Sequence, residues 1–457
     1  MKWRVMVEVT GEEGAVTQHV ISEGKRTGAG QAATLGLSLS EGKATLAGLQ
    51  RVLVMAQADA HCRLRRRCGH CGASRPLKDH RSRRLVSLFG TVEVRAPRFK
   101  PCRCGVACRR SLTPVAEIMP DRCTPEYERI LSGMGSALPY RRARALLAEL
   151  LPLDAAPDVE TVRRRTLQVG ARLERAALVP PDEGSSAPAT AITLAIDAGH
   201  VKSIKTYQVR SFEVMLARVG NDQGREVVFS SLPTEADRQV RQLHHVLRRL
   251  GATATTPVTI LSDGAEGPRS LGAAASVGPI RNVLDWFHLS MRVQHVAQAV
   301  KGWATAVPDA AERTTMLDDA VTRLRWRLWH GQTERALTLI GDLLTDLDAA
   351  LEAADDPPAR KVAALLRALE TYVVGQADLI IDYAAARHRG EAISTATTES
   401  TVQRLLHRRM GANQQMRWSP RGAHRMLKVR TAVMNGTLAA DHAAAEPYAR
   451  RPFRRAA

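Results

Sequence analysis

The order of strand-like and helical segments between residues 191 and 288 constrains the fold of this chain most strongly. Three strand-like segments follow one another, and helical segments then separate two further strand-like segments. The clearest of them read, in chain order, ITLAID, YQVRSFEVMLARVG, REVVFSSLP, EADRQVRQLHHVLRRL, PVTILSD and RNVLDWF. Successive strands followed by alternating helices and strands are typical of an α/β sheet with a mixed strand order. We therefore predict an α/β domain over residues 191–288.

The chain around this domain divides by composition. Its 457 residues exceed one ordinary domain, which has about 100 to 200 residues. Residues 179–190, rich in Pro, Ser and Gly, predict a linker directly before the α/β domain. We expect six further parts: an N-terminal strand and helix over 1–60, a basic cysteine module over 61–123, a helical region over 124–178, a helical insertion over 289–390, the last helices of the α/β domain over 391–435, and a basic tail over 436–457.

The first hundred residues contain three local signals of secondary structure. MKWRVMVEV alternates like a strand, and we predict one strand within residues 1–30. Ser40 is predicted to cap the helix that follows, with Glu41 in its first turn. LVSLFGTVEVRAPRF predicts a hairpin that turns at Phe89-Gly90.

The formal charge of +20 is concentrated in two stretches. Residues 61–110 hold fifteen Lys or Arg against two acids, and residues 404–457 hold twelve against two. An anionic polymer is the simplest partner for two separate basic zones. We therefore predict binding to nucleic acid, and the alternative is a solvated basic face without a partner.

The sequence does not indicate a membrane protein. Its apolar runs fall short of the roughly 18 residues of a spanning helix, and its first residues alternate like a strand instead of resembling a signal peptide. We expect a cytoplasmic protein without membrane attachment. Closely spaced cysteines in such a protein indicate metal ligands before disulfides.

Residues 124–176 have helical periodicity with a break at Pro152–Pro157. Thr124 starts the first helix, ARALLAELL forms the second, and the third begins at Asp158. A short break before a third helix is compatible with a helix-turn-helix DNA reader. Plain packing and a dimer surface are the alternatives.

Two aspartates follow apolar strands of the α/β domain. Asp197 closes ITLAID, with Ala198-Gly199 after it where we expect the chain to leave the sheet, and Asp263 closes VTILSD. Ligand sites gather at the carboxyl ends of strands in open α/β sheets, so the two carboxylates could converge. The alternative is that each is an ordinary turn or helix-cap residue.

Glu399 could supply a third carboxylate. It begins a predicted helix, Thr398–Met410, and the apolar Val402 and Leu406 share its face, so the carboxylate is aimed inward. Three close carboxylates repel one another, and Mg²⁺ relieves that repulsion while leaving room for phosphate oxygens. The set therefore suits two-metal phosphoryl transfer. An ordinary first-turn glutamate is the alternative for this position.

Three other acids are alternative members of this carboxylate set, namely Glu266, Glu391 and Asp222. Glu391 precedes the predicted helix of Glu399 and is the best substitute for it.

Several strings together resemble bacterial insertion-sequence transposases of the DDE class, specifically the ISKra group. Those in the α/β domain and beyond are AIDAGHVKS, ILSDGAEG, VLDWFHLSMRVQHV, TESTVQRLLHRRM and MRWSPRGAHRMLKVR. Upstream strings that share the resemblance are SLSEGKATL, CGHCGASRPLKDHRSR and LFGTVEVRAPRFKPCRC. The resemblance covers most of residues 35–435.

This resemblance implies a ribonuclease-H-like catalytic core with an all-α insertion before the last acid. It implies that Asp197, Asp263 and Glu399 are the DDE triad and bind two Mg²⁺ or Mn²⁺ ions. The reaction would be metal-dependent hydrolysis at the transposon end, followed by attack of the freed 3′-hydroxyl on target DNA. The partners would be double-stranded DNA and further copies of the chain on that DNA, at the nucleoid of a bacterium.

Related transposases also carry an Asp-x-x-His pattern after the second acid, which Asp285 and His288 match. The pair would support the triad, with His288 as a hydrogen-bond donor or phosphate contact. A structural role is the alternative.

Four cysteines predict a zinc-ribbon-like module. Cys68-x-x-Cys71 and Cys102-x-Cys104 flank the predicted hairpin, and tetrahedral Zn²⁺ takes four thiolates. A small β unit with few large apolar residues needs such a structural metal. Cys108 or His70 could replace one ligand, and reduced buried thiols are the alternative to zinc.

Basic residues near these cysteines and after Glu399 are predicted to contact DNA phosphates, which supplies affinity without sequence choice. They are Arg65, Arg66, Arg67, Lys78, Arg81, Arg83, Arg84, Arg404, Arg408 and Arg409. Trp418 could stack on a base or pack inside the protein.

Three functions are compatible with these signals. The triad favours an active transposase. A DNA-binding protein of transposase descent that no longer cleaves, and a nuclease of the same fold that leaves cut ends unjoined, are the alternatives.

Overall fold

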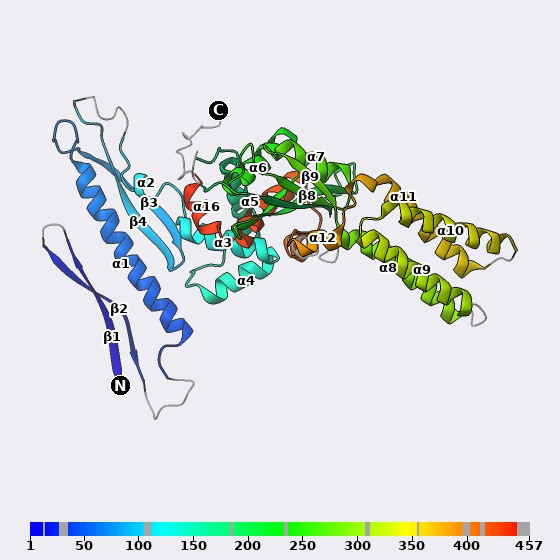
Figure 1. Ribbon diagram of the computed structural model, residues 1–457. Helices are drawn as coiled ribbons and strands as arrows, with labels where there is room; N and C mark the ends of the chain where they lie inside the picture. Colours follow the sequence, from blue (N-terminus) through cyan, green and yellow to red (C-terminus); the bar gives the residue numbers. More distant parts are fainter. Residues whose placement is uncertain are drawn as a thin grey trace. The chain divides into compact units, whose positions relative to one another are not determined.

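The computed structural model describes residues 1–11, 14–26, 35–104, 111–182, 186–232, 236–306, 311–353, 356–395, 403–411 and 416–445 (Figure 1). The chain forms two compact units. The first, which we call the N-terminal unit, combines Met1–Ala176 with Gly436–Ala457. The second, which we call the sheet unit, comprises Ala177–Asn435.

The N-terminal unit begins with a hairpin and a long helix. Strands β1 (Lys2–Thr10) and β2 (Val16–Lys25) pair antiparallel, and helix α1 (Leu39–Arg66) packs against them. The prediction of a single strand in residues 1–30 was wrong, because β2 places apolar and polar residues too irregularly to show strand alternation. The cap of α1 is Ser38, two residues before the predicted Ser40. Ser38 accepts a hydrogen bond from the Glu41 amide, and Glu41 accepts one from the Ser38 amide.

A second hairpin packs on α1. Strands β3 (Leu77–Ser87) and β4 (Gly90–Phe99) pair antiparallel, and Ser87 lies opposite Gly90. The turn is therefore Leu88-Phe89, one residue before the predicted Phe89-Gly90. Gly90 itself has a φ of +112°, a backbone conformation that favours glycine. The core between the hairpin and α1 consists of Val54, Ala58, Cys62, Leu85, Val92, Val94, Ala96, Val115 and Met119.

The predicted helical region forms three helices after a short α2 (Val115–Ile118). They are α3 (Pro125–Ala137), α4 (Tyr140–Leu150) and α5 (Val159–Ala176). Thr124 caps α3 by accepting a hydrogen bond from the Tyr127 amide, as expected for a Thr-Pro start. The predicted tail is partly ordered as well, because Leu438–Ala444 form helix α16, which contacts α3 and α5.

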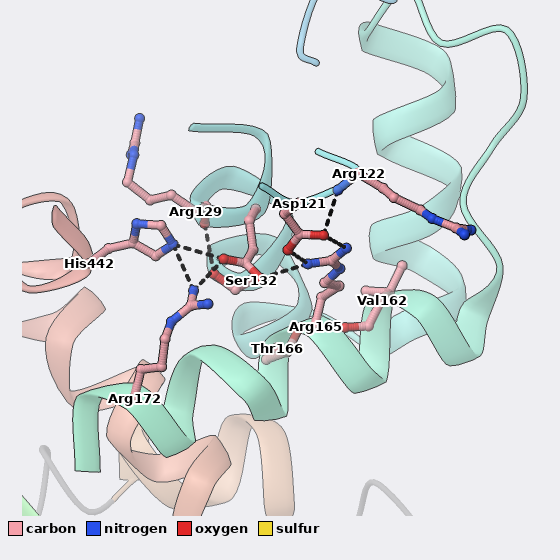
Figure 2. A network of polar contacts seen from close by, with 10 residues as sticks. Asp121, Arg122, Arg129, Ser132, Val162, Arg165, Thr166, Arg172 and His442 are labelled. Carbon is pink, nitrogen blue, oxygen red and sulfur yellow. Dashed lines mark hydrogen bonds and ion pairs between the residues drawn. The ribbon is translucent and has the colours of Figure 1, made fainter. Parts of the chain in front are cut away.

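A buried carboxylate holds these helices together (Figure 2). Glu128 of α3 has no exposed area, and it accepts hydrogen bonds from Arg165 and Arg172 of α5 and from His442 of α16. Arg165 also binds both oxygens of Asp121. Burial works against ionisation of Asp121, but the hydrogen bonds from Arg165 hold its pKa below the ordinary value. We call Asp121, Glu128, Arg165, Arg172 and His442 the Glu128 hub.

The sheet unit contains the predicted α/β domain. Its five strands are β5 (Ile192–Lys202), β6 (Ser211–Asn221), β7 (Glu226–Ser231), β8 (Val258–Ser262) and β9 (Ile280–Leu284). They lie in the order β7-β6-β5-β8-β9. β5, β6 and β7 pair antiparallel, whereas β8 and β9 run parallel to β5. Helices α6 (Ala236–Arg249) and α7 (Glu266–Ala275) connect the later strands, which confirms a mixed α/β sheet.

The two faces of this sheet pack against different helices. Ile192, Leu194 and Ile196 share a core with α6 and α7. Ala195 and Leu261 belong to a second core, built with the helices that follow β9. Strand residues alternate between faces, so Asp197 lies on the face of this second core. Asp263 follows β8, and its carbonyl is bound by Tyr372, which packs against the same core.

The helices after β9 form the predicted insertion (Figure 1). They are α8 (Trp286–Ala306), α9 (Ala311–Trp329), α10 (Thr333–Ala353), α11 (Pro357–Gly375), the short 3₁₀ helix η3 (Ala377–Leu379) and α12 (Tyr383–His388). The chain then continues through the π-helical turn η4 (Gln403–His407) and α14 (Arg408–Met410) to α15 (Pro420–Met434), which contacts β7. Across the described ranges, every helix is too short or too polar to span a membrane.

Candidate active site and cysteine cluster

Three aspartates stand at the same edge of the sheet. The parallel pairing of β5 with β8 ends at Ala195 and Leu261, and Asp197 and Asp263 each lie two residues beyond that pair. The pairing of β8 with β9 ends at Ser262 and Leu284, so Asp263 and Asp285 each lie one residue beyond it. The strand register therefore carries all three to the carboxyl edge of β5, β8 and β9.

The sequence predicted that Asp197 ends its strand, and this prediction was wrong. β5 continues to Lys202, and Asp197 lies opposite Leu216 of β6. The chain leaves the parallel pairing with β8 at this point but stays paired with β6, so Ala198 and Gly199 remain extended. Asp197 is half-buried, and its carboxylate accepts a hydrogen bond from the Ala198 amide at 2.7 Å.

Asp263 lies in a turn that the helical insertion holds. Its carboxylate accepts a hydrogen bond from the Ala265 amide at 2.9 Å, and its carbonyl accepts one from the Tyr372 hydroxyl at 2.7 Å. Gly264 has a φ of +94°, and a Cβ there would meet the Gln376 side chain at 2.7 Å, so this position requires glycine. Burial raises the pKa of Tyr372 to about 12, which keeps the hydroxyl a donor at neutral pH. Arg292 of α8 lies over the Tyr372 ring, 3.9 Å from its centroid.

Asp285 is completely buried and its acceptors are occupied. Its Oδ1 accepts hydrogen bonds from the amides of Phe287 and Thr395, at 3.0 and 2.8 Å. Its Oδ2 accepts from His288 Nδ1 at 2.6 Å and from the Thr395 hydroxyl. Burial opposes ionisation, but these hydrogen bonds outweigh it and hold the pKa of Asp285 below its ordinary value. This buried aspartate is therefore an anion that organises neighbouring groups.

His288 is the hydrogen-bond partner of Asp285 at this acidic edge. Its hydrogen bond to Asp285 raises its pKa, and the charges of Asp197 and Asp263 add to that rise although burial opposes it. The electrostatic influence of both aspartates on one imidazole agrees with the strand register. The predicted pair Asp285 and His288 is thus brought together, next to the two predicted acids.

The third predicted acid, Glu399, lies outside the described residues. The described residues that come nearest before Glu399 end at Thr395. Two of them, Ile393 and Thr395, are held near this edge by hydrogen bonds. The Trp286 amide donates to the Ile393 carbonyl at 3.0 Å, and Thr395, 2 % exposed, binds Asp285.

Glu391, the substitute for Glu399, is engaged elsewhere. Its carboxylate pairs with Arg389 and with Arg281, and the hydrogen bond from Arg389 is the main reason that its pKa is lowered. These two arginines compensate the charge of Glu391 without a metal ion. This argues against Glu391 as the third acid in place of Glu399.

The residues that fix the site were not all visible in the sequence. Tyr372 and Thr395 were missed, because one is an ordinary core position of a helix and the other stands in a run of small polar residues. The sequence offers no signal for either contact. Each joins residues about 110 positions apart, separated by 109 for Tyr372–Asp263 and 110 for Thr395–Asp285.

The four predicted zinc ligands come together in the N-terminal unit. The sulfur atoms of Cys68, Cys71, Cys102 and Cys104 all lie within 4.8 Å of one another, and none of them forms a disulfide. The Sγ of Cys68 is 3.8 Å from that of Cys104, and the Sγ of Cys71 is 3.2 Å from that of Cys102. A tetrahedron with Zn–S bonds of about 2.3 Å has sulfurs about 3.8 Å apart. This set therefore fits a zinc ion.

Within the first cysteine knuckle, Cys68 favours a thiolate, whereas neighbouring cysteines raise the pKa of Cys71 to about 12. Backbone amides of Cys71 and His70 donate to the Cys68 sulfur and lower the pKa of Cys68 to about 6. His70 contributes its amide, and its side chain does not belong to the cluster. Cys108 lies outside the described residues. Arg75 ties the knuckle to α1, because its buried guanidinium donates to the Arg65 and Arg67 carbonyls at the end of that helix.

The predicted DNA contacts near the cysteines differ in availability. Arg65 pairs with Glu117 at 2.8 and 2.9 Å, and Arg83 donates to the Met119 carbonyl. These two arginines hold α1 and β3 against α2 and its C-terminal end, and their contact with DNA stays a prediction. The exposed members of the set are Arg66, Arg67, Lys78, Arg81 and Arg84.

The basic residues after Glu399 also differ. Arg404 and Arg408 are exposed, whereas Arg409 is 1 % exposed and lies 5.3 Å from the Trp418 ring. The prediction that Arg409 contacts DNA is therefore corrected, since its guanidinium is inside the protein. Trp418 is 6 % exposed and packs, and its amide donates to the Lys202 carbonyl at the end of β5.

Comparisons with known proteins add little to this geometry. No protein-family model matches the chain, and no curated protein matches it. Among solved structures, it is similar to a chain of the Drosophila P element transposase strand transfer complex, with a TM-score of 0.34 and 14% sequence identity. That similarity covers 69% of this chain and 93% of the other, and its TM-score is too low to establish a shared fold.

Proposed function

We propose that this chain is a DDE-class DNA transposase whose active site comprises Asp197, Asp263 and Glu399. The register of β5 and β8 carries the proposal, because it brings two aspartates 66 residues apart in sequence to the same sheet edge. The acids are half-buried, and their negative charges add to the rise in the pKa of His288. The resemblance of the sequence to insertion-sequence transposases selects this reaction among those that such an edge could support.

The fold supports the same proposal. The resemblance implies a ribonuclease-H-like core interrupted by helices before the last acid. The sheet order β7-β6-β5-β8-β9, followed by α8 to α12, agrees with that expectation. Asp263 follows β8 and precedes the insertion in the sequence, and Glu399 comes after the insertion, so the insertion separates two proposed members of one site.

The proposed residues have distinct tasks. Asp197, Asp263 and Glu399 would hold two Mg²⁺ or Mn²⁺ ions, since hard oxygen ligands suit those ions. The ions, when bound, supply a nucleophile of lowered pKa and stabilise the departing oxygen. Asp285 holds His288 in one orientation and protonated, and His288 donates a hydrogen bond to a phosphate oxygen of the DNA. Tyr372 and Gly264 keep the Asp263 turn in place.

DNA is the proposed partner of the exposed basic residues in both units. They comprise Arg66, Arg67, Lys78, Arg81, Arg84, Arg404 and Arg408. Successive strand residues point to opposite faces, so Arg81 and Arg84 lie on different faces of the second hairpin and contact different phosphates. We expect the chain to form a homo-oligomer on DNA, in the cytoplasm of a bacterium at its nucleoid.

The experiment that tests the function is cleavage and joining of the element's own terminal DNA with Mg²⁺. We expect Asp197→Asn, Asp263→Asn and Glu399→Gln each to lower the rate by at least about 10³-fold, as for loss of a group that stabilises the transition state directly. Glu391→Gln is the control and should retain activity. Wild-type activity in all three variants would refute the site, and cut ends that stay unjoined would identify a nuclease.

Zinc content tests the cysteine cluster separately. The full-length protein should contain one zinc ion, and Cys68→Ser should lose it and unfold the second hairpin, because metal binding and folding of such a module are coupled. Cys62→Ser is the control, since Cys62 belongs to α1 and is buried in the core with the hairpin, outside the cluster. Full zinc occupancy in Cys68→Ser would rule out this ligand set.

A further inference from the structure

The hairpin formed by β5 and β6 extends beyond the acidic edge of the sheet. β8 and β9 end at Ser262 and Leu284, whereas β5 stays paired with β6 as far as Lys202. Lys202 comes five residues after Asp197, which corresponds to about 17 Å in an extended strand. We call residues 203–210, which join the two strands, the β5–β6 tip. This tip therefore stands outside the carboxyl edge, where ligands of open α/β sheets bind.

Backbone hydrogen bonds fix the base of the β5–β6 tip. The Ser203 amide donates to the Arg210 carbonyl at 3.0 Å and closes the turn. On the other side of β5, the Trp418 amide donates to the Lys202 carbonyl at 2.9 Å, and the Ile204 amide donates to the Trp418 carbonyl at 3.1 Å. Ser203 and Trp418 are buried, with 1 % and 6 % of their surface exposed. The strand pairing and these contacts together set the position of the tip relative to the acidic edge.

The side chains of the β5–β6 tip are basic and exposed. Residues 201–212 hold three Lys or Arg and no Asp or Glu. Every residue from Lys205 to Arg210 is exposed, and 46 % of the surface of Tyr207 is in contact with solvent. Arg417, which is also exposed, donates to the Ser203 carbonyl at 3.3 Å and adds a further positive charge. The tip thus combines an ordered backbone with positive charge and an aromatic ring in solvent.

Positive charge beside three aspartates suits a polyanion that must approach them. The carboxylates of Asp197, Asp263 and Asp285 repel phosphate groups, so nearby cations have to offset that repulsion. Lys, Arg and Tyr side chains are common donors to DNA phosphates. The length of about 17 Å between Asp197 and the end of β5 equals the axial rise of about five base pairs. One duplex segment can therefore contact the acidic edge and the β5–β6 tip together.

A second copy of the chain is the other occupant to consider. The exposed large apolar side chains of the β5–β6 tip are those of Tyr207 and Val209. They are too few for a protein interface, which buries about 800 Å² on each partner. The charge and the position of the tip favour DNA instead.

We propose that the β5–β6 tip holds DNA at the acidic edge, with Lys205, Tyr207 and Arg210 as phosphate contacts. These contacts do not depend on base sequence, and they supply affinity and position for the strand that is cut. The inference rests on the proposed function, because it takes DNA as the substrate of the acidic edge. It concerns side chains outside the proposed triad and outside the basic residues already proposed to contact DNA.

The salt dependence of binding tests these contacts. Fluorescence anisotropy measures binding of the full-length protein to a labelled duplex of arbitrary sequence at several salt concentrations. Each phosphate contact contributes about 0.9 to the slope of log affinity against log salt concentration. We expect the double variant Lys205→Gln with Arg210→Gln to reduce this slope by about 1.8 and to weaken binding at least about 10-fold at about 0.1 M salt. Tyr207→Phe removes a neutral donor, so it should weaken binding about 5-fold and leave the slope unchanged.

Arg248→Gln with Arg249→Gln is the matched control. It removes the same charge from the exposed end of α6, which leads into β8 and therefore lies at the opposite edge of the sheet. Its slope should equal that of the wild type. Cleavage of the element's terminal DNA gives a second readout. The double variant of the tip should raise KM about 10-fold and leave kcat unchanged, as expected for residues that bind substrate without taking part in the chemistry.

The outcomes separate this inference from the proposed function. Wild-type affinity and slope in the double variant, or a loss no larger than in the control, would overturn the tip contact and leave the transposase proposal standing. If the tip binds a second copy of the chain, the double variant will change the sedimentation of the DNA-free protein and keep its DNA affinity, which overturns the inference as well. A slope reduced as expected, without cleavage by the wild type, would support the tip contact and overturn the proposed function. Should the double variant fail to fold, Lys205→Gln alone should reduce the slope by about 0.9, and the same measurements decide.

Discussion

Within the described part of the chain, two carboxylates are fully buried, and they differ in the partners around them. Glu128, in the N-terminal unit, accepts hydrogen bonds from two guanidinium groups and one histidine. Asp285, in the sheet unit, accepts from two backbone amides, one hydroxyl and one histidine. Each is 0 % exposed, so burial alone does not distinguish them.

The balance of charge around each carboxylate distinguishes a structural hub from a functional edge. The Glu128 hub places two arginines with two carboxylates, so its charges compensate one another inside the protein. At the Asp285 edge, the negative charges of three aspartates together raise the pKa of one histidine. We propose that divalent cations from solution complete the charge balance of this edge, as they do in a metal-dependent site.

The largest predicted effect breaks the compensated hub. Arg165→Met should lower the free energy of unfolding of the N-terminal unit by about 3 to 5 kcal/mol, because it leaves Asp121 and Glu128 without a shared cation. Chemical denaturation followed by circular dichroism measures this change. Arg163→Met, two residues earlier, is the control and should change stability by less than about 1 kcal/mol, since Arg163 and its partner Glu160 are exposed. Equal effects of the two variants would contradict the hub.

The sequence predicts the helices of this hub but not the hub itself. The Thr-Pro start of α3 and the break before α5 are local signals, and both helices form where they were expected. Glu128 looks like a first-turn acid that favours the helix dipole. Its partners lie 37, 44 and 314 residues away, and no local rule connects such positions. Helix α16 was not predicted for the same reason, because it is stabilised by packing against α3 and α5, which are distant in sequence.

A smaller effect concerns the histidine at the functional edge. The pKa of His288 is raised by its pairing with Asp285, so the stability from its positive charge is present below its unfolded pKa of about 6.5. That contribution is lost as the pH rises through the folded pKa. His288→Asn should therefore lower the free energy of unfolding by about 2 kcal/mol at pH 6, and the loss should shrink steadily toward pH 9.

Denaturation of wild type and His288→Asn across this pH range measures that trend. His19→Asn, on the exposed strand β2, serves as the control and should show no such slope. A destabilisation that stays constant from pH 6 to pH 9 would mean that the charge of His288 is not what stabilises the edge.

The functional edge was more predictable than the hub, because strand periodicity has consequences across a sheet. Apolar runs ending in Asp197 and Asp263 indicated two strands whose ends could meet, and the register places both residues two positions past one pair. The prediction that β5 ends at Asp197 was wrong, because pairing with β6 extends the strand and the sequence alone does not show that pairing. It could not show Tyr372 or Thr395, whose roles depend on how the insertion folds back.

The smallest predicted effect is a stabilisation, opposite in sign to the two effects above. It tests the comparison between the Glu128 hub and the Asp285 edge most directly. Asp263→Asn removes one negative charge from the acidic edge, and its amide oxygen can still accept the hydrogen bond from Ala265 that Asp263 accepts. Without divalent metal, we expect it to stabilise the sheet unit by about 0.5 kcal/mol, as when an active-site charge is removed at the expense of function. Glu128→Gln should destabilise the N-terminal unit instead, because Arg165 and Arg172 each lose an ion pair with this buried carboxylate. Thermal melts without metal measure both changes, with Glu266→Gln as the control for an exposed acid of α7.

Added Mg²⁺ should stabilise the wild type more than Asp263→Asn, because only a state that binds the ion gains from it. Destabilisation by Asp263→Asn without metal would mean that the edge is already compensated, and the distinction between the two carboxylate clusters would be lost.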